Sequence, residues 1–242
     1  MILNDFCDEL SDALFPPLCL ACSDVLSGAA DQVFCPDCQR QITFITGNRC
    51  PVCGIIFPDS PSEDHLCGNC LEHKPWFSCA RAAVSYEGVV LDAIRRFKYG
   101  RDITTGSALA TFLSGFEFDD LDFNMFDAIV PVPLHIKRLR ERGFNQSLIL
   151  ARALGKKHNL NVDFSLLKRC KLTLTQTGLD KTERQKNISG AFVAGPREKI
   201  RGRNLILVDD VYTTGATINE CARTLIKTGA AKVAVLTLAR VL

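Results

Sequence analysis

The segment Leu205–Thr217 combines the residue types that an anion-binding site needs. Its first four residues are apolar and predict a buried parallel strand, because both faces of such a strand are covered. The helical spacing of Ile218, Cys221 and Leu225 predicts a helix directly after the segment. Between strand and helix, where the chain is expected to leave the sheet, stand two carboxylates and a small hydroxyl-rich turn: Asp209, Asp210, Thr213, Thr214, Gly215, Ala216 and Thr217.

A turn of this kind favours a phosphate ligand. Unpaired amide groups and the helix dipole both attract an anion at a helix N-terminus, and Gly215 is expected to let the backbone approach that anion closely. Asp209 and Asp210 can accept hydrogen bonds from a sugar diol or hold Mg²⁺ through their oxygens. The same residues also fit a strand that ends in two solvated acids before a capped helix.

The segment resembles the phosphoribosyl-pyrophosphate (PRPP) loop of type I phosphoribosyltransferases. In that loop a hydrophobic run, two acids and an apolar residue precede Thr-Thr-Gly-x-Thr. The resemblance implies that Asp209 and Asp210, as the catalytic acids, hold the ribose hydroxyls of PRPP together with Mg²⁺. It also implies that the amides from Thr213 to Thr217 hold the 5′-phosphate. Binding follows from this pattern, whereas catalysis does not.

Cations follow the predicted strand that ends at Pro133. They are Lys137, Arg138, Arg140 and Arg142, and Lys98 at the end of an earlier helix is a further candidate for an anion ligand. Arginine binds phosphate oxygens with two donors at once, and the pyrophosphate loop of the family follows its first core strand in the same way. A solvated basic turn and a helix C-terminus that favours cations account for the same residues.

A polar segment without periodicity, Thr173–Phe192, predicts a lid. Phosphoribosyltransferases close a hood over the site, which excludes water from the reacting centre. The resemblance implies that Lys181, Arg184 and Lys186 reach the leaving pyrophosphate. The alternative is an ordinary exposed excursion between two strands.

Eight of the twelve cysteines form four C-x-x-C pairs, which are Cys19/Cys22, Cys35/Cys38, Cys50/Cys53 and Cys67/Cys70. Two such pairs make a tetrahedral S₄ zinc site without an open position, so we expect two structural zinc ions. The first twenty residues carry acids and no basic region, so no signal peptide is predicted, and a reducing cytosol favours zinc over disulfides. Sequential pairing suits short hairpins and is preferred, although a cross-braced arrangement also fits the spacing.

Charge divides the chain into an acidic and a basic part. Residues 1–79 hold 11 acidic and 3 basic residues, whereas the remaining residues hold 16 and 26. The acidic part is too short for a comfortable hydrophobic core, which makes stabilisation by metal plausible. We therefore predict a double zinc-ribbon domain with an N-terminal helix at 1–78 and a phosphoribosyltransferase-like domain at 79–242. No apolar run approaches the roughly 20 residues that a membrane span needs.

The basic part alternates between strands and helices, which implies right-handed βαβ units around a parallel sheet with helices on both faces. Ligands of such sheets bind at the carboxyl ends of the strands. The predicted elements are strands at 82–86, 128–133, 162–168, 205–208 and 233–238, helices at 89–99, 102–116 and 145–158, and the helix after Thr217.

In this order the pieces resemble the ComF family of competence-associated, phosphoribosyltransferase-like proteins. The resemblance rests on the paired cysteines and on FKYGR at 97–101, PVP at 131–133, RGFNQ at 142–146, Gln176, Asn187 and VDDVYTTGAT at 208–217. It implies a bacterial cytoplasmic protein that supports DNA uptake and natural transformation, with competence proteins of DNA-uptake or helicase type as partners.

Two functions fit these residues. The first is an enzyme that transfers the phosphoribosyl group of PRPP to an unknown acceptor. The alternative is a non-catalytic module that senses a phosphate compound or binds single-stranded DNA along its basic face, with Phe144 as a candidate stacking platform. Phe144 fits core packing equally well. Binding of DNA would weaken steeply with salt, and this separates the two functions.

Overall fold

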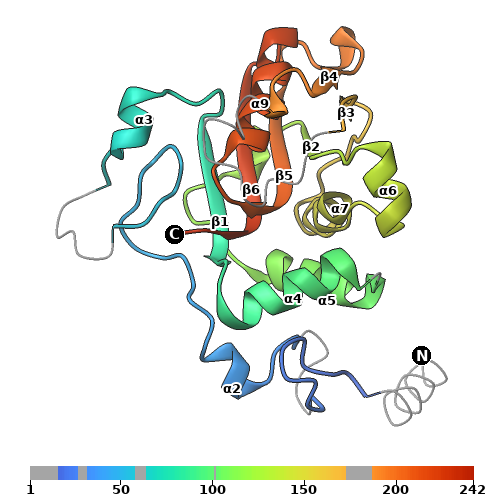
Figure 1. Cartoon of the computed structure of the whole chain (residues 1–242). Coiled ribbons are helices and arrows are strands. Elements are labelled where there is room, and N and C mark those ends of the chain that lie inside the picture. Colours follow the sequence, from blue (N-terminus) through green and yellow to red (C-terminus); the bar gives the residue numbers. More distant parts are fainter. Residues whose placement is uncertain (1–15, 27–31, 58–63, 101, 173–186) are drawn as a thin grey trace.

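The computed structural model describes residues 16–26, 32–57, 64–100, 102–172 and 187–242. Its centre is a parallel sheet with the strand order β1-β6-β5-β2 (Figure 1). A separate antiparallel pair, β3-β4, lies beside it. The strands are β1 (Cys79–Ser85), β2 (Ala128–Pro131), β3 (Leu167–Arg169), β4 (Phe192–Ala194), β5 (Asn204–Tyr212) and β6 (Lys232–Arg240).

Helices cover both faces of the sheet, with α4, α5 and α7 on one face and α9 on the other (Figure 1). The predicted α/β fold with a parallel sheet is therefore confirmed. The helices are α2 (Pro36–Gln39), α3 (Gly68–Glu72), α4 (Gly88–Tyr99), α5 (Ile103–Gly115), α6 (Ile136–Arg142), α7 (Gln146–His158) and α9 (Ala216–Thr228), with 3₁₀ turns η1 (Phe123–Met125) and η2 (Arg197–Lys199). Across the described ranges, no helix has the length and apolarity that crossing a membrane needs.

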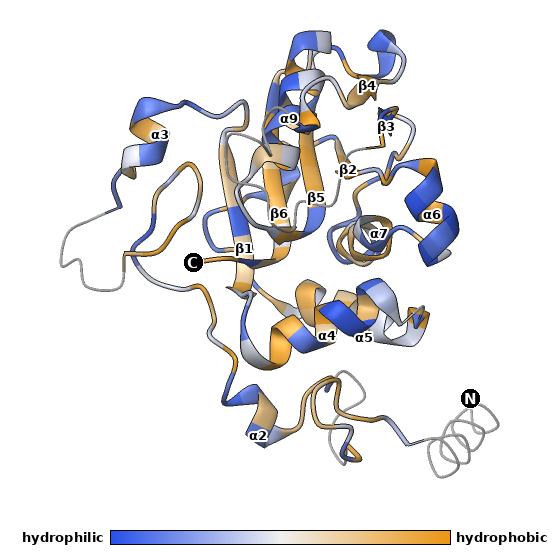
Figure 2. Ribbon diagram, viewed as in Figure 1, coloured by the Kyte–Doolittle hydropathy of each residue, from blue (hydrophilic) through white to orange (hydrophobic). Residues whose placement is uncertain are grey.

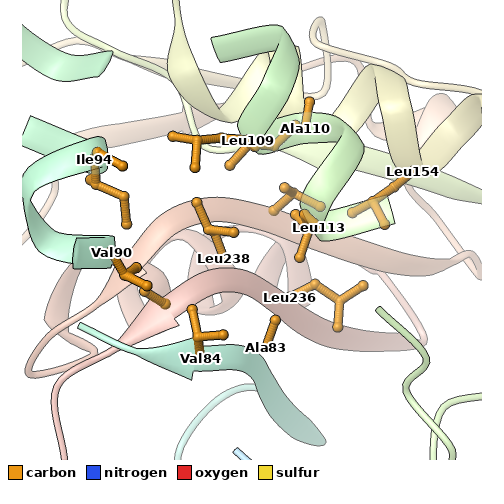
Figure 3. Packing of buried hydrophobic residues seen from close by; sticks show 14 of the residues in the cluster. Ala83, Val84, Val90, Ile94, Leu109, Ala110, Leu113, Leu154, Leu236 and Leu238 are labelled. Atoms are coloured by element: carbon orange, nitrogen blue, oxygen red, sulfur yellow. The ribbon is translucent and has the colours of Figure 1, made fainter. Parts of the chain in front are cut away.

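Each face of the sheet carries its own hydrophobic core because side chains alternate along a buried strand. Leu236 and Leu238 of β6 pack against Leu109 and other residues of the helices on one face (Figure 3). Val233 and Val235 of the same strand belong to the core under α9. Figure 2 shows β5 and β6 as largely apolar strands, as burial on both faces requires.

The strand predicted at 162–168 is wrong as a member of the central sheet. Val162 forms a single parallel bridge with Ile129, and the next strand, β3, begins only at Leu167 and pairs with β4. In the sequence, residues 170–191 therefore connect two strands that pair with each other.

Strand β5 extends further than the apolar run predicts. It continues to Tyr212, so that Asp209 and Asp210 lie inside the strand instead of after it. Strand β6 accompanies β5 to this end, but the opposite neighbour β2 ends at Pro131. Both acids therefore lie beyond the end of one neighbouring strand, where the sheet is open to a ligand.

The cysteine-rich part lies against several sides of the α/β part. Its first half packs on α5, where Phe34 meets Phe112 edge-to-face at 5.5 Å between ring centroids. The following residues cover the free edge of β1, since the amide of Ile45 donates to the carbonyl of Ala83 at 3.0 Å. Its second half, which contains α3, lies away from α2 in Figure 1. The domain division at 78/79 stays a prediction, and the predicted N-terminal helix lies outside the described residues.

Candidate functional site

The two acids of β5 have different partners. Asp209 accepts hydrogen bonds from the hydroxyl of Ser147 at 2.8 Å and from the amide of Asp210 at 2.9 Å. Asp210 instead forms an ion pair with Lys98, whose Nζ lies 3.0 Å from its Oδ2. Ser147 is held at the start of α7 because Asn145 caps that helix and accepts from the Ser147 amide at 3.1 Å. Helices α4 and α7 thus each place one polar group on the end of β5.

Burial and the charge of Asp210 change the acid–base behaviour of Asp209. Burial, and next the charge of Asp210, raise the pKa of Asp209 to about 7, although the donors from Ser147 and the Asp210 amide pull it downward. Burial lowers the pKa of Lys98, but attraction to Asp210 and Asp209 outweighs it and keeps that pKa above its ordinary value. Lys98 is therefore a fixed cation, and Asp209 is poised to exchange a proton near neutral pH.

A cavity of about 530 Å³ opens in front of these acids. Its wall contains the acids themselves and most of the predicted phosphate turn, Thr213, Gly215, Ala216 and Thr217. Five cationic side chains also line this cavity: Arg95, Lys98, Arg138, Arg142 and Arg169. The cavity therefore offers carboxylates for hydroxyls or a metal ion and guanidinium groups for phosphate oxygens, side by side.

The cations predicted on α6 separate into two groups. Arg138 and Arg142 line the cavity, whereas Lys137 and Arg140 are not among the described residues of its wall. These cations lie on one helix, α6, whose successive side chains point in different directions. They therefore cannot all face the cavity. Lys181, Arg184 and Lys186 of the predicted lid lie outside the described residues.

Thr214 faces a different space from the rest of the turn. It lines a second cavity of about 610 Å³, which shares Gly215 and Ala216 with the first and extends between α9 and the segment that follows α3. The hydroxyl of Thr214 is buried and has no hydrogen-bond partner among the residues that the structure describes. Thr214 is thus part of the predicted turn but is not brought to the acids.

Sequence reasoning missed Arg95 and Arg169. Arg95 lies three residues before Lys98 on α4, so the helical period could have revealed it. Arg169 ends β3, and burial together with the charges of Arg138 and Arg142 lowers its pKa, as expected where guanidinium groups converge. Its place beside the other cations depends on how β3 folds back, which no local pattern shows.

Gln146 supplies an independent sign of a missing polar ligand. Its side chain is 1% exposed and lines the first cavity. Its Oε1 accepts from Arg142 at 3.1 Å, but its Nε2 has no hydrogen-bond partner among the described residues. A buried donor without an acceptor costs free energy, about 1–3 kcal/mol, unless a ligand satisfies it.

Gly215 is required for a reason other than the expected approach of a ligand. It adopts the left-handed backbone conformation, with φ of +75°, as the residue that precedes α9. A Cβ at this position would also collide with the ring and hydroxyl of Tyr212. The tight turn therefore rests on Tyr212, and any larger residue would displace it.

The structure groups the paired cysteines sequentially. One cluster contains Cys19, Cys22, Cys35 and Cys38 and the other Cys50, Cys53, Cys67 and Cys70, with all sulfur atoms of a cluster within 4.8 Å of one another. Two sulfur–sulfur distances are 3.7 Å (Cys22 to Cys35) and 3.6 Å (Cys53 to Cys67). Zn–S bonds of about 2.3 Å in a tetrahedron separate the sulfurs by roughly 3.8 Å, so both clusters fit zinc.

Backbone donors favour the thiolate form of one cysteine in each cluster. Burial opposes the charge on Cys19, but the amides of Cys35, Cys22 and Ala21 outweigh it and lower its pKa to about 6. The pKa of Cys50 falls to about 7 for the same reasons. Other ligands show the opposite direction: burial and the neighbouring thiols raise the pKa of Cys38 to about 11 and raise the pKa of Cys70 well above its ordinary value. Zinc binds thiolates, so the metal itself must favour deprotonation of these ligands.

Comparison with known proteins agrees with this geometry. The family model "Double zinc ribbon domain" matches residues 10–71, and "Phosphoribosyl transferase domain" matches residues 147–242. Competence protein F of Haemophilus influenzae is 32% identical over 226 residues, which cover 92% of this chain and 96% of that protein. The chain belongs to the ComF family. This ComF protein therefore has two structural Cys₄ zinc sites and a type I phosphoribosyltransferase-like fold.

A second relative of this ComF protein has a name that refers to DNA. The DNA utilization protein YhgH of Escherichia coli is 32% identical over 238 residues, 94% of this chain and 98% of that protein. Among solved structures, the glutamine PRPP amidotransferase of B. subtilis matches 55% of this chain and 25% of its own, with 17% identity and a TM-score of 0.37.

Proposed function

We propose that this ComF protein binds PRPP with Mg²⁺ in the first cavity and transfers its phosphoribosyl group to a nitrogen acceptor. The observation that carries the proposal is that Asp209, Asp210, five cations and the N-terminus of α9 line one cavity. PRPP has complementary groups in the same order: a 5′-phosphate, two ribose hydroxyls and a pyrophosphate. Gln146 offers a further buried donor for one of their oxygens.

The residues have distinct roles in this proposal. The first-turn amides of α9 hold the 5′-phosphate, and the oxygens of Asp209 and Asp210 hold the ribose hydroxyls. Mg²⁺, when bound, neutralises charge on the pyrophosphate oxygens. As the bond between C1′ and the pyrophosphate oxygen breaks, Arg138, Arg142 and Arg169 stabilise the departing anion. The acceptor nitrogen forms the new bond to C1′ and loses its proton.

Calorimetric titration of PRPP with Mg²⁺ into the full chain tests the binding step. Wild-type protein should show saturable binding, and Asp209→Asn combined with Asp210→Asn should weaken it about a hundredfold or more, since each lost charge-assisted hydrogen bond contributes about 1.5–3 kcal/mol. Arg142→Met and Arg140→Met form a matched pair on one helix. The first should weaken binding and the second should not. Equal effects, or no binding by the folded wild type, would refute the proposed site.

The alternative function is non-catalytic binding of single-stranded DNA. Tyr99 favours it, because its ring is 75% exposed at the mouth of the cavity with Arg142 at 5.5 Å from the ring centroid. Phe144 is partly buried and stacks on the buried Phe97 at 5.4 Å, which supports core packing for this ring. For DNA, log affinity should fall with log salt by about 0.7 per neutralised phosphate, and Tyr99→Ala should weaken binding. PRPP binding would show a far smaller salt slope.

Either function suits a role in competence. We propose that the protein supports DNA uptake and natural transformation in the cytoplasm, as the names of its relatives suggest, together with competence proteins of DNA-uptake or helicase type. Deleting the gene and complementing it with the Asp209→Asn/Asp210→Asn variant tests this role. Failure of that variant to restore transformation would show that the role depends on the first cavity. Full restoration would show that the role does not depend on it.

A further inference from the structure

The phosphate turn rests on a buried side chain that does not face the ligand. Tyr212 is the last residue of β5, immediately before the turn, and its side chain is 8% exposed. Its ring and hydroxyl occupy the space where a Cβ of residue 215 would lie. The position of Gly215, and with it the first amides of α9, therefore depends on the position of Tyr212.

Arg240 in turn holds Tyr212. The two residues are partners in the register of β5 and β6, and the guanidinium of Arg240 lies 4.9 Å from the centroid of the Tyr212 ring. Arg240 is 4% exposed, so the cation and the ring interact in a site largely removed from water, where such contacts contribute most. The same guanidinium donates a hydrogen bond to the backbone carbonyl of Cys53.

Cys53 is a ligand of the second zinc cluster, and its turn is fixed to the sheet. The carbonyl of Val52 accepts from the amide of Ala80 in β1 at 2.7 Å. Gly54, with φ of +72°, lies so close to the carbonyl of Ala80 that no Cβ would fit. The contact between Cys53 and Arg240 is therefore part of a rigid joint and not a chance approach of two surfaces.

These contacts form a continuous path from a zinc ligand to the phosphate turn: Cys53, Arg240, Tyr212 and Gly215. We propose that Tyr212 and Arg240 are positioning residues that couple the second zinc cluster to the phosphate turn, so that zinc and PRPP strengthen each other's binding. The inference rests on the proposed binding of PRPP at this turn. Without zinc, the thiolates repel one another, the carbonyl of Cys53 loses its place, and the support of the ring under Gly215 weakens.

The first cluster has no comparable path in the described structure. It packs on the opposite face, where its neighbour Phe34 contacts α5. Its nearest polar link to a helix of the site is an exposed hydrogen bond of 3.2 Å from Arg96 to the carbonyl of Ala21. An exposed hydrogen bond of this kind transmits little free energy. The coupling should therefore be specific to one of the two zinc ions.

Zinc release from the full-length protein tests the coupling. A chromogenic zinc chelator is mixed with wild-type protein in the presence and absence of PRPP and Mg²⁺, and the phase of the second cluster is identified by its loss in Cys70→Ser. Coupling is reciprocal and commonly amounts to about fivefold or more. Differences in affinity lie mostly in the dissociation rate, so PRPP should slow the second phase by about that factor and leave the first unchanged.

Two variants distinguish coupling from a purely structural role. Arg240→Met should abolish the effect of PRPP on zinc release and weaken PRPP binding about fivefold, whereas Arg240→Lys, which keeps a donor and a cation, should restore part of both. A structural role would instead speed release equally with and without PRPP. The coupling is refuted if the wild type binds PRPP but releases both zinc ions at unchanged rates. If the wild type binds no PRPP at all, the proposed function fails, and the coupling fails with it.

Discussion

The two zinc clusters each have four cysteine ligands with nearly the same spacing, but they contact different regions of the α/β part. The first lies beside α5 and is joined to it through apolar packing, with Phe34 against Phe112. The second lies on β1 and reaches the end of β6 through the polar contact between Cys53 and Arg240. A zinc ribbon is thus a stabilising unit whose further role depends on the surface beneath it.

The comparison also explains why one chain carries two ribbons. Helix α5 and the free edge of β1 need cover, and the first ribbon with the segment after it supplies that cover. Among the described residues, the second ribbon has a small cluster of its own, in which Val52, Ile55 and Phe57 pack against the buried Cys50, Cys53 and Cys70. It contacts Arg240 through the carbonyl of Cys53 and β1 through the carbonyl of Val52.

Removing one cysteine ligand from each cluster in turn should distinguish the two clusters most strongly, because it changes both zinc content and PRPP affinity. Cys38→Ser and Cys70→Ser replace equally buried cysteines, and each should reduce the zinc content from two ions to one. Losing a structural zinc removes on the order of 10 kcal/mol from the ribbon that holds it. PRPP affinity, measured by calorimetry, should fall about tenfold in Cys70→Ser and less than about twofold in Cys38→Ser. Equal losses would contradict the distinction between the ribbons.

A pair of aromatic truncations separates stability from binding. Phe34 is 2% exposed beside the first cluster, and Phe77 is 4% exposed and meets Tyr212 edge-to-face at 6.4 Å. Each Phe→Ala change should lower the free energy of unfolding by about 3–5 kcal/mol, as chemical denaturation would show. Only Phe77→Ala should also weaken PRPP binding. If Phe34→Ala weakens PRPP binding as much, then PRPP binding depends on the stability of the whole protein and not on the contact between Phe77 and Tyr212.

The proton on Asp209 distinguishes the site from both ribbons. Its pKa in the folded protein is about 7, above the ordinary 3.8, so the folded state holds this proton longer than the unfolded state. The contribution of this proton to the free energy of unfolding is fully present below the ordinary pKa and is lost as pH rises through 7. Because ribose and Mg²⁺ require the carboxylate, PRPP binding should strengthen from pH 6 to 8 and release a proton below pH 7. Calorimetry in two buffers of different ionisation enthalpy measures that proton.

Two variants check the assignment of this proton. Ser147→Ala removes a donor to the Asp209 carboxylate, so the pH dependence should move to higher pH. Cys38→Ser should keep the wild-type profile, because the polar link that the described structure shows from the first cluster to α4 is an exposed hydrogen bond from Arg96 to the carbonyl of Ala21. An unchanged profile in Ser147→Ala would show that another group titrates.

The smallest effect concerns the ion pairs of Asp120, which lies in the loop between α5 and η1. Asp120 pairs with Arg81 of β1 at 2.6 Å and with Arg49 at 3.6 Å, and its side chain is 35% exposed. Burial opposes its charge, but the two arginines lower its pKa, so its contribution is present at neutral pH and is lost as pH falls through that lowered pKa. Because solvent screens a partly exposed pair, Asp120→Asn should cost less than about 1 kcal/mol. A much larger loss in denaturation would mean that the pair fixes both ribbons.

Local patterns predicted the parts of this molecule that depend on neighbours in sequence. The turn at Thr213–Thr217, the helix after it and the cysteine pairs follow from spacing alone, because each is built within a few residues. The grouping of the cysteine pairs agrees with the preferred sequential arrangement. The roles of the site residues, including those of the predicted lid, stay predictions.

Contacts between distant segments could not be predicted in the same way. Arg169 joins the cations of α6 only because β3 pairs with β4, and Arg240 meets Tyr212 only because β6 lies beside β5. Strand β5 continues beyond its apolar run because β6 still pairs with it there. A hydropathy pattern cannot predict this pairing. The strand predicted at 162–168 failed because its apolar residues are divided between a bridge to β2 and the short β3.

A crystal structure of the protein with PRPP and Mg²⁺ would show most directly whether PRPP binds in the first cavity. The account predicts the 5′-phosphate at the amides of Gly215 to Thr217, the ribose hydroxyls on Asp209 and Asp210, and the pyrophosphate between Arg138, Arg142 and Arg169. It also predicts that Gln146 Nε2 gains an acceptor. Ligand bound elsewhere, or a cavity without ligand at saturating PRPP in a protein with both zinc ions, would contradict the account.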